Sequence, residues 1–413
     1  MDNRSWSARL VPAIGWALGG VALITLVMAV RGLMPYRDPA FANYDHMTYL
    51  AMAEQGIGSP GKASVPPFCW RILTPWIAGE LPLPAPAAFF VITWLSVVGA
   101  TVGVYLLVVR RGHAHRIGVL AQLAFLTFFW AVGQNIWSYL MVDALTLVLL
   151  IAGLIVLQER SWTAGARCAA LGLLLVLGAL AKESYLMLAA AAGIALWREP
   201  GSSRAARAVR ALVTIAPAVL VMLAVRRAIH PDLNQPSEFP GYSLLAVAAA
   251  VVRSRLAALP QWAMDVLVDP WGPLVVTPAI LSPLVTLSWW RRRPELSAFA
   301  ALGFAQTLVG TSGGRLAVLA APAVILFLVE GVELFAEGSP GWRGTLALLF
   351  TLQFVFEYLR RTTLGFSIPP YAPNVWVTAA HVARGLSFVA FIAVWMTRGT
   401  RRGHAAAPGG ATR

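Results

Sequence analysis

The chain has 413 residues and a formal net charge of +14, with 58% hydrophobic and 12% charged residues. A soluble domain usually has about 25% charged and about 45–50% apolar residues, so this composition excludes an ordinary soluble protein. Apolar runs of about 20 residues recur along the chain, which is the length that crosses a bilayer as a helix. We therefore predict a polytopic membrane protein. Its excess of arginine then marks cytoplasmic loops rather than a nucleic-acid partner.

The first apolar run covers residues 10–30 and follows a short basic N-terminus. It is longer than the hydrophobic region of a signal peptide and lacks a small-residue cleavage site, so we predict a retained first span. Residues 34–85 are too polar for lipid and are predicted to form a structured first outer loop. Residues 86–109 then form the second span.

The rest of the chain alternates between apolar runs and polar turns. The further predicted spans are residues 117–132, 136–157, 168–181, 184–197, 211–229, 270–290, 296–309, 316–334, 342–356 and 375–396. Two further outer segments are expected at residues 230–269 and 357–374. Within the first of these, residues 244–259 are apolar but interrupted by Arg253 and Arg255, which favours a helix lying on the membrane surface.

These elements predict an all-α transmembrane helix bundle of about 11–13 spans. Residues 1–400 form one integral-membrane domain, and residues 401–413 form a flexible basic tail. The distribution of arginines places both termini in the cytoplasm and the protein in the plasma (inner) membrane. A few arginines fall on the outer face instead, where an anionic ligand would need them. They are Arg226, Arg227, Arg253, Arg255, Arg315, Arg360 and Arg361.

The first outer loop contains two acids, Asp38 and Asp45, and His46 follows the second. Asp45 begins a predicted short helix at the membrane surface. A carboxylate in that position can act as a general base toward a hydroxyl group. The alternative, which composition alone favours, is that Asp45 caps the helix N-terminus, where aspartate is common.

The same loop continues with Phe68-Cys69-Trp70-Arg71. The guanidinium group of Arg71 suits a phosphate or a carboxylate. The alternative is an anchor at the membrane interface, where aromatic residues are common.

Two later stretches combine charges with apolar surroundings. Asp143 is predicted seven residues inside a span, and Lys182 and Glu183 form an outer turn. Asp143 and Lys182 could form an ion pair that holds two helices together. Alternatively they bind substrate, and Lys182 then contacts a phosphate as a point charge. The small residues of the turn GTSGGR, Gly310 to Arg315, would let backbone N–H groups at the start of the next helix bind an anion. The alternative is a flexible turn with no ligand.

No two histidines have the spacing of metal ligands. The pairs Asp45–His46 and His230–Asp232 are compatible with a divalent ion, but ordinary polar side chains explain them as well. We predict no cofactor and no metal site.

Taken together, these motifs resemble the GT-C superfamily of integral-membrane glycosyltransferases. The resemblance rests on a D-x-x-x-Y-x-x-x-A pattern from Asp45 to Ala53, a segment Trp70 to Pro75, the acid in a middle span, an AKES turn from Ala181, and the late glycine-rich turn with Arg315. It covers about 300 residues. It implies transfer of a sugar from a polyprenyl-phosphate donor to a glycan, lipid or protein acceptor at the outer face, with inversion.

The resemblance also implies roles for individual residues. Asp45, or else Asp38, would be the catalytic base. Residues near the donor or acceptor would be His46, Arg71, Asp143, Lys182, Glu183 and Arg315, of which Arg71, Lys182 and Arg315 would bind the donor phosphate.

Two features depart from the superfamily pattern. Asp38 and Asp45 are not adjacent, and no large C-terminal domain follows the spans, which argues against the oligosaccharyl- and mannosyltransferases that carry one. A multi-span transporter or lipid flippase is the alternative, because the number of spans suits one and Asp143 lies in a span. A non-catalytic scaffold of the cell envelope is a third possibility.

Overall fold

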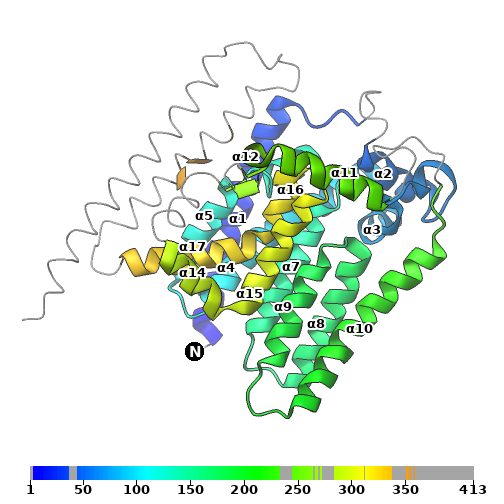
Figure 1. Ribbon diagram of the computed structural model, residues 1–413. Helices are drawn as coiled ribbons and strands as arrows, with labels where there is room; N and C mark the ends of the chain where they lie inside the picture. The colour runs from blue at the N-terminus through cyan, green and yellow to red at the C-terminus, as the bar shows by residue number, and fades with distance from the viewer. Residues whose placement is uncertain are drawn as a thin grey trace, which may run out of the picture.

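In the computed structural model, the described residues are 3–36, 44–232, 244–263, 266–267, 270–271, 283–310, 312–336, 350–351, 353–354 and 358. These residues form helices, short 3-10 turns and loops, so the predicted all-α class is confirmed (Figure 1). The predicted span 375–396, the tail 401–413 and nearly all of residues 342–374 lie outside the described residues, as does Asp38.

Within the described residues, five segments are long and apolar enough to cross a membrane. They are Leu10–Val30 within α1 (Asn3–Arg31), α4 (Ala85–Val109), α8 (Ala164–Ala181), α10 (Arg204–Ala228) and the segment Gly313–Glu330. The helices α7 (Asp143–Gln158) and α9 (Tyr185–Trp197) are also apolar but shorter. The protein is therefore a multi-pass membrane protein.

The spans differ in how much protein surrounds them. In the most apolar 18-residue stretch of α10, only 11% of the residues are buried by the rest of the protein. In Gly313–Glu330 the share is 89%. The latter segment joins α16 (Gly313–Ala317), the turn Val318–Ala320 and α17 (Ala321–Ala336). Because lipid and protein interiors are both apolar, hydropathy alone does not separate an outer helix such as α10 from a central one.

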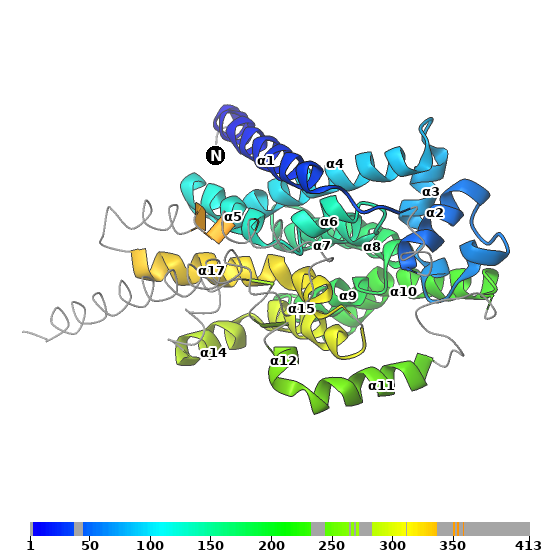
Figure 2. The same cartoon turned by 90° about the horizontal axis from the view of Figure 1, so that it is seen from above.

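The helices α4, α7, α8 and α10 pack side by side, and α9 packs between α10 and α15 (Pro294–Ala305) (Figures 1 and 2). On the other side, α4 packs against α5 (His115–Thr127) and α1. The remaining described helices are α11 (Leu244–Ala257), α12 (Leu259–Ala263) and α14 (Pro283–Arg292). The predicted surface segment 244–259 is thus helical, with a break before Leu259.

The segment predicted as the first outer loop is folded where the structure describes it, at residues 34–36 and 44–85. It contains α2 (Asp45–Gln55), the 3-10 turns Gly61–Ser64 and Phe68–Trp70, and α3 (Leu73–Glu80). Tyr49, Met52 and Phe68 bury their side chains together with Phe89 of α4. This shared apolar core fixes the loop onto one end of the bundle, next to the start of α7 (Figure 1).

The predicted hairpin of spans 117–132 and 136–157 is wrong. Helix α5 ends at Thr127, and a buried irregular segment with the short helix α6 (Gly133–Trp137) leads to α7. Leu140 and Val142 are apolar because they pack into the core of the first loop, not because they cross a bilayer. As a result Asp143 is the first residue of α7, rather than seven residues inside a span.

Two helix starts are also corrected. Helix α10 begins at Arg204, seven residues before the predicted span, and α16 begins at Gly313, so Arg315 lies in a helix and not in a turn.

Candidate functional site

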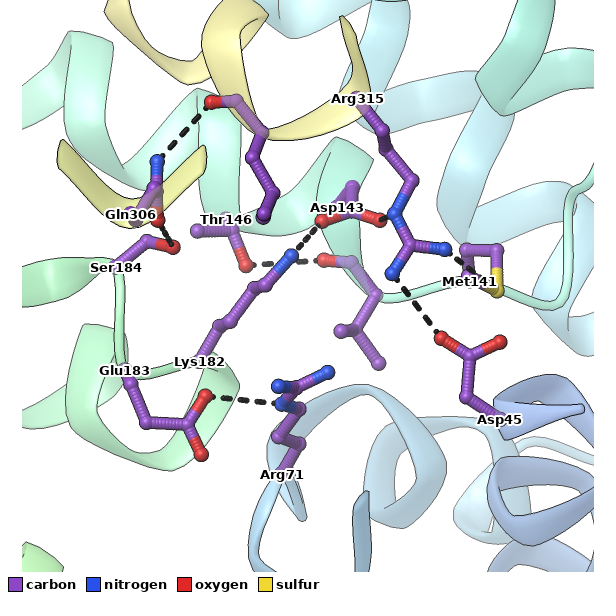
Figure 3. Close-up of polar contacts among 12 residues, drawn as sticks. Asp45, Arg71, Met141, Asp143, Thr146, Lys182, Glu183, Ser184, Gln306 and Arg315 are labelled. Atoms are coloured by element: carbon purple, nitrogen blue, oxygen red, sulfur yellow. Dashed lines mark hydrogen bonds and ion pairs between the residues drawn. The ribbon is translucent and has the colours of Figure 1, made fainter. Parts of the chain in front are cut away.

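Five chain segments meet at the end of the bundle that carries the first loop (Figure 3). Asp45 begins α2, Arg71 follows the turn Phe68–Trp70, and Asp143 begins α7. Lys182 and Glu183 lie between α8 and α9, and Arg315 lies in α16. Six of the eight predicted site residues therefore belong to one cluster of charged side chains, which we call the ion-pair cluster.

Arg315 connects the two aspartates of the cluster. Its Nη2 atom lies 3.2 Å from Oδ2 of Asp45, and its Nε atom lies 3.3 Å from Oδ2 of Asp143. The carboxylates are 6% and 4% exposed, so both are removed from water and need the cation. Asp45 does not cap α2, because Tyr44 holds the cap position. Its carboxylate is directed into the cluster instead.

Lys182 donates from Nζ to Oδ1 of Asp143, and both side chains are nearly fully buried. The ion pair expected between the two helices is therefore present, although it forms at their ends. Thr146, one turn further along α7, donates its hydroxyl to the carbonyl of Val142 next to this pair (Figure 3).

Arg71 forms the other half of the cluster. It donates from Nε to Oε2 of Glu183 at 3.0 Å and from Nη1 to the hydroxyl of Tyr49 at 2.9 Å, and it lies over the ring of Phe68. Burial disfavours the charged form of Glu183, but the guanidinium of Arg71 outweighs this and lowers the pKa of the carboxyl group. Nη2 of Arg226, in α10, lies 3.9 Å from the other carboxylate oxygen of Glu183, Oε1.

His46 lies beside Asp45 but is fully buried, and its ring stacks on Tyr44. Burial lowers its pKa, so the imidazole is neutral near pH 7 and adds no positive charge to the cluster. Burial also raises the pKa of the Cys69 thiol to about 12, which excludes a thiolate nucleophile there.

Three polar residues of the site were not predicted from the sequence. Ser184 donates to Oε1 of Gln306 at 2.7 Å, and Gln306 donates to the carbonyl of Leu316 at 3.0 Å, which ties α9 to the helix that carries Arg315 (Figure 3). Tyr49 was part of the quoted pattern without a role. Its spacing of four residues from Asp45 places both side chains on one face of α2, and that spacing was a usable signal.

The glycine-rich stretch serves packing. A Cβ atom on Gly314 would lie 2.7 Å from the indole ring of Trp130. Any larger residue would therefore push α16 and Arg315 away from their neighbours. This contact gives Gly314 a packing role, and the anion-binding turn expected at residues 310–315 stays a prediction.

A metal site needs several ligand side chains close together. Among the residues that the structure describes, no three His, Cys, Asp or Glu side chains come together as metal ligands would.

No protein-family model matches the sequence, and no curated protein matches it. Among solved structures, the chain is similar to the crystal structure of the Archaeoglobus fulgidus oligosaccharyltransferase tethered with an acceptor peptide that contains the NVT sequon. The two chains are 13% identical, with a TM-score of 0.43 over 83% of this chain and 54% of the other. This chain thus spans about half the length of that one.

The sequence motifs had disfavoured an oligosaccharyltransferase within the GT-C superfamily, and the likeness to this structure concerns the fold alone. The roles of individual side chains come from the contacts of this chain itself. By fold, the described residues form a helical membrane protein with several candidate spans.

Proposed function

We propose that the protein is a membrane glycosyltransferase that moves a sugar from a polyprenyl-phosphate donor to an acceptor hydroxyl at the outer face of the plasma (inner) membrane. The observation that carries this proposal is the ion-pair cluster. Asp45 from the predicted first outer loop pairs with Arg315, which also pairs with Asp143, and Asp143 pairs with Lys182. Acids and cations from separate segments therefore converge next to membrane-spanning helices.

The reaction needs both signs of charge. The acceptor oxygen attacks the anomeric carbon of the sugar, its new bond forms on the face opposite the donor phosphate, and the bond from that carbon to the phosphate oxygen breaks. Asp45 accepts the proton of the acceptor hydroxyl, and the electron pair of the broken bond leaves with polyprenyl phosphate. The configuration at the anomeric carbon is therefore inverted.

The cations have most effect in the transition state. A sugar-linked phosphodiester carries one negative charge, and the departing phosphate gains a second as the bond breaks. Arg71, Lys182 and Arg315 would stabilise this added charge more than they stabilise the bound donor, which is the condition for rate acceleration. Arginine also fits two phosphate oxygens with its two parallel N–H groups.

The carboxylates hold these cations before the donor arrives. Asp143 contacts Lys182 and Arg315, and Glu183 contacts Arg71. Each cation is thus already placed, and little reorganisation is required when phosphate binds. Asp143 and Glu183 would act as positioning residues rather than as the base.

A transporter is the less favoured function. It requires polar groups along a path through the membrane midplane. Asp143, the residue that best suited transport, begins α7 and is enclosed by Lys182 and Arg315 at one end of the bundle.

The acceptor of the proposed reaction is a hydroxyl of a glycan, lipid or protein.

The proposal predicts that Asp45→Asn abolishes sugar transfer. Loss of a general base typically costs about 10²- to 10⁴-fold in rate, so we expect at least about a hundredfold loss. The measurement is transfer of labelled sugar from a panel of polyprenyl-phosphate sugars by the purified protein in detergent.

Glu54→Gln is the matched control, because Glu54 is an exposed acid on the same helix. It should leave the rate and the melting temperature unchanged. Asp45→Asn loses its charge pair with Arg315 and should melt at a lower temperature, so both rates are measured well below that melting temperature. Wild-type rates in a well-folded Asp45→Asn protein would remove Asp45 from the reaction.

A further inference from the structure

A large cleft lies at the end of the bundle opposite the ion-pair cluster. Its volume is about 1650 Å³, and it is lined by residues around the C-terminal ends of α4, α7, α9 and α14, together with Glu330 of α17. Helix α7 begins at Asp143 in the cluster and ends at Gln158 in the cleft. Sixteen helical residues span about 24 Å, so the cleft is a separate site.

The cleft is positively charged. Seven arginines and four glutamates line it, which leaves an excess of three positive charges. The lining arginines are Arg110, Arg111, Arg160, Arg167, Arg198, Arg292 and Arg293, and the glutamates are Glu159, Glu199, Glu295 and Glu330.

Most of the carboxylates are already occupied. Glu330 accepts from Arg111 at 3.1 Å and from Arg293 at 2.6 Å, and also from the indole N–H of Trp289. These contacts connect α17 to the ends of α4 and α14. Such residues hold the walls of the cleft and leave little negative charge inside it.

Glu199 and Glu159 are held in the same way. Glu199 pairs with Arg167 and Arg210, and Glu159 pairs with Arg110. Glu159, which follows α7, and Glu199, which follows α9, are thus both neutralised by arginines of the protein.

Three arginines remain available to a ligand. Arg160, Arg198 and Arg292 are exposed, and none of them takes part in an ion pair between described residues. They come from three different places, after α7, after α9 and at the end of α14, and all line the same space. Guanidinium groups converging from several sides suit a phosphate group.

Apolar side chains lie in the same cleft. Leu157, Ala195 and Pro200 line it and are partly or fully exposed, and the buried side chains of Leu154, Leu196 and Leu296 lie behind them. A ligand there meets both arginines and a hydrocarbon surface. A small inorganic anion would use only the first, whereas an amphiphile with a charged head would use both.

We propose that this cleft binds the phosphate-bearing headgroup of an anionic membrane phospholipid, in the leaflet opposite the ion-pair cluster. Basic pockets between membrane-spanning helices bind anionic headgroups, and each nearby arginine contributes to the attraction. The predicted topology places this arginine-rich end in the cytoplasm, where the leaflet is negatively charged. The proposal does not depend on the transferase function.

The test is titration of the purified full-length protein in nonionic detergent with phosphatidylglycerol, phosphatidylcholine and inorganic pyrophosphate, read by native mass spectrometry. The wild type should prefer phosphatidylglycerol. The triple variant Arg160→Gln/Arg198→Gln/Arg292→Gln should weaken this binding at least about tenfold.

A matched triple variant, Arg116→Gln/Arg204→Gln/Arg291→Gln, removes the same charge from exposed arginines that do not line the cleft. It should change the affinity less than about twofold. The single variant Arg198→Gln, measured alongside in case the triple variant folds poorly, should weaken binding about fivefold.

Equal losses in the two triple variants would mean that only general surface charge is sensed, and would overturn the site. Pyrophosphate binding as tight as that of phosphatidylglycerol would assign the cleft to a soluble phosphate compound and overturn the lipid headgroup.

Discussion

Asp143 and Lys182 illustrate how charges are kept at a membrane interface. Each side chain is nearly fully buried, and each carries the charge that the other requires. Arg315 adds a second cation next to Asp143. Removing one member of such a group leaves an uncompensated charge in a medium of low polarity, which is far more costly than losing an exposed pair.

Lys182→Met should therefore destabilise the protein by about 3 kcal/mol, measured as the free energy of unfolding in mixed micelles. The control is Arg110→Met, which breaks the more exposed pair with Glu159 and should cost less than about 1 kcal/mol. The double variant Lys182→Met/Asp143→Leu should recover part of the loss, because no unpaired acid remains. Similar costs for the two single variants would contradict a buried pair.

At the scale of elements, close helix contacts place the residues of the site. Gly303 of α15 is buried against the turn that follows α16. A Cβ atom there would lie 2.9 Å from Cβ of Ala320 and 2.8 Å from Cε of Met187. Ala320 is five residues beyond Arg315, so α15 supports the helix from which Arg315 reaches both aspartates.

Gly303→Ala should cost about 1–3 kcal/mol through overpacking and should also slow sugar transfer, because α16 must shift. Gly165→Ala is the matched control in a helix, since a Cβ atom at Gly165 has nothing within 4 Å. Thermal melting and the transfer assay measure both effects. A Gly303→Ala protein as stable and active as the control would show that this contact does not position Arg315.

At the scale of the whole molecule, the ion-pair cluster and the arginine-lined cleft occupy opposite ends of the helices. The proposed reaction requires the cluster outside and the cleft inside. This orientation agrees with the excess of arginines at the cleft end.

Single cysteines test this orientation. In a background with Cys69→Ala and Cys168→Ser, we expect Glu54→Cys to react with a membrane-impermeant maleimide on intact spheroplasts. Arg116→Cys, which lies at the cleft end, should react only after permeabilisation. Both positions are exposed, so accessibility is limited by the membrane alone. The reverse pattern would place the proposed catalytic end in the cytoplasm.

The sequence predicted the fold class well because the requirements of lipid leave a strong local signal. The bounds of the spans at α4 and α9 were predicted to within one residue. A continuous apolar run identifies α4, and charged residues on both sides delimit α9. The irregular segment before α7 was missed. Its residues are as apolar as a span, and only the contact with the first loop explains why.

The charged residues of the site were identifiable individually, because Asp45, Arg71, Asp143, Lys182 and Arg315 are polar groups among apolar neighbours. Their partners were not identifiable, with the exception of the Asp143–Lys182 pair. Arg315 and Asp45 are 270 positions apart, and no local pattern records that they meet. Gln306 was overlooked because an uncharged polar residue gives a weak signal, whereas Tyr49 was quoted without a role although its spacing from Asp45 was a usable signal.

By itself, then, the sequence determined a helical membrane protein with its charges collected at the ends of spans, since burying a peptide group or a charge in lipid is costly whatever the fold. The tertiary structure decided which charges face one another. It brought Asp45 of the first loop to Arg315 of α16, and it gathered arginines that follow α7 and α9 and end α14 around one cleft. Such pairings depend on how helices pack, and packing is a property of the assembled chain.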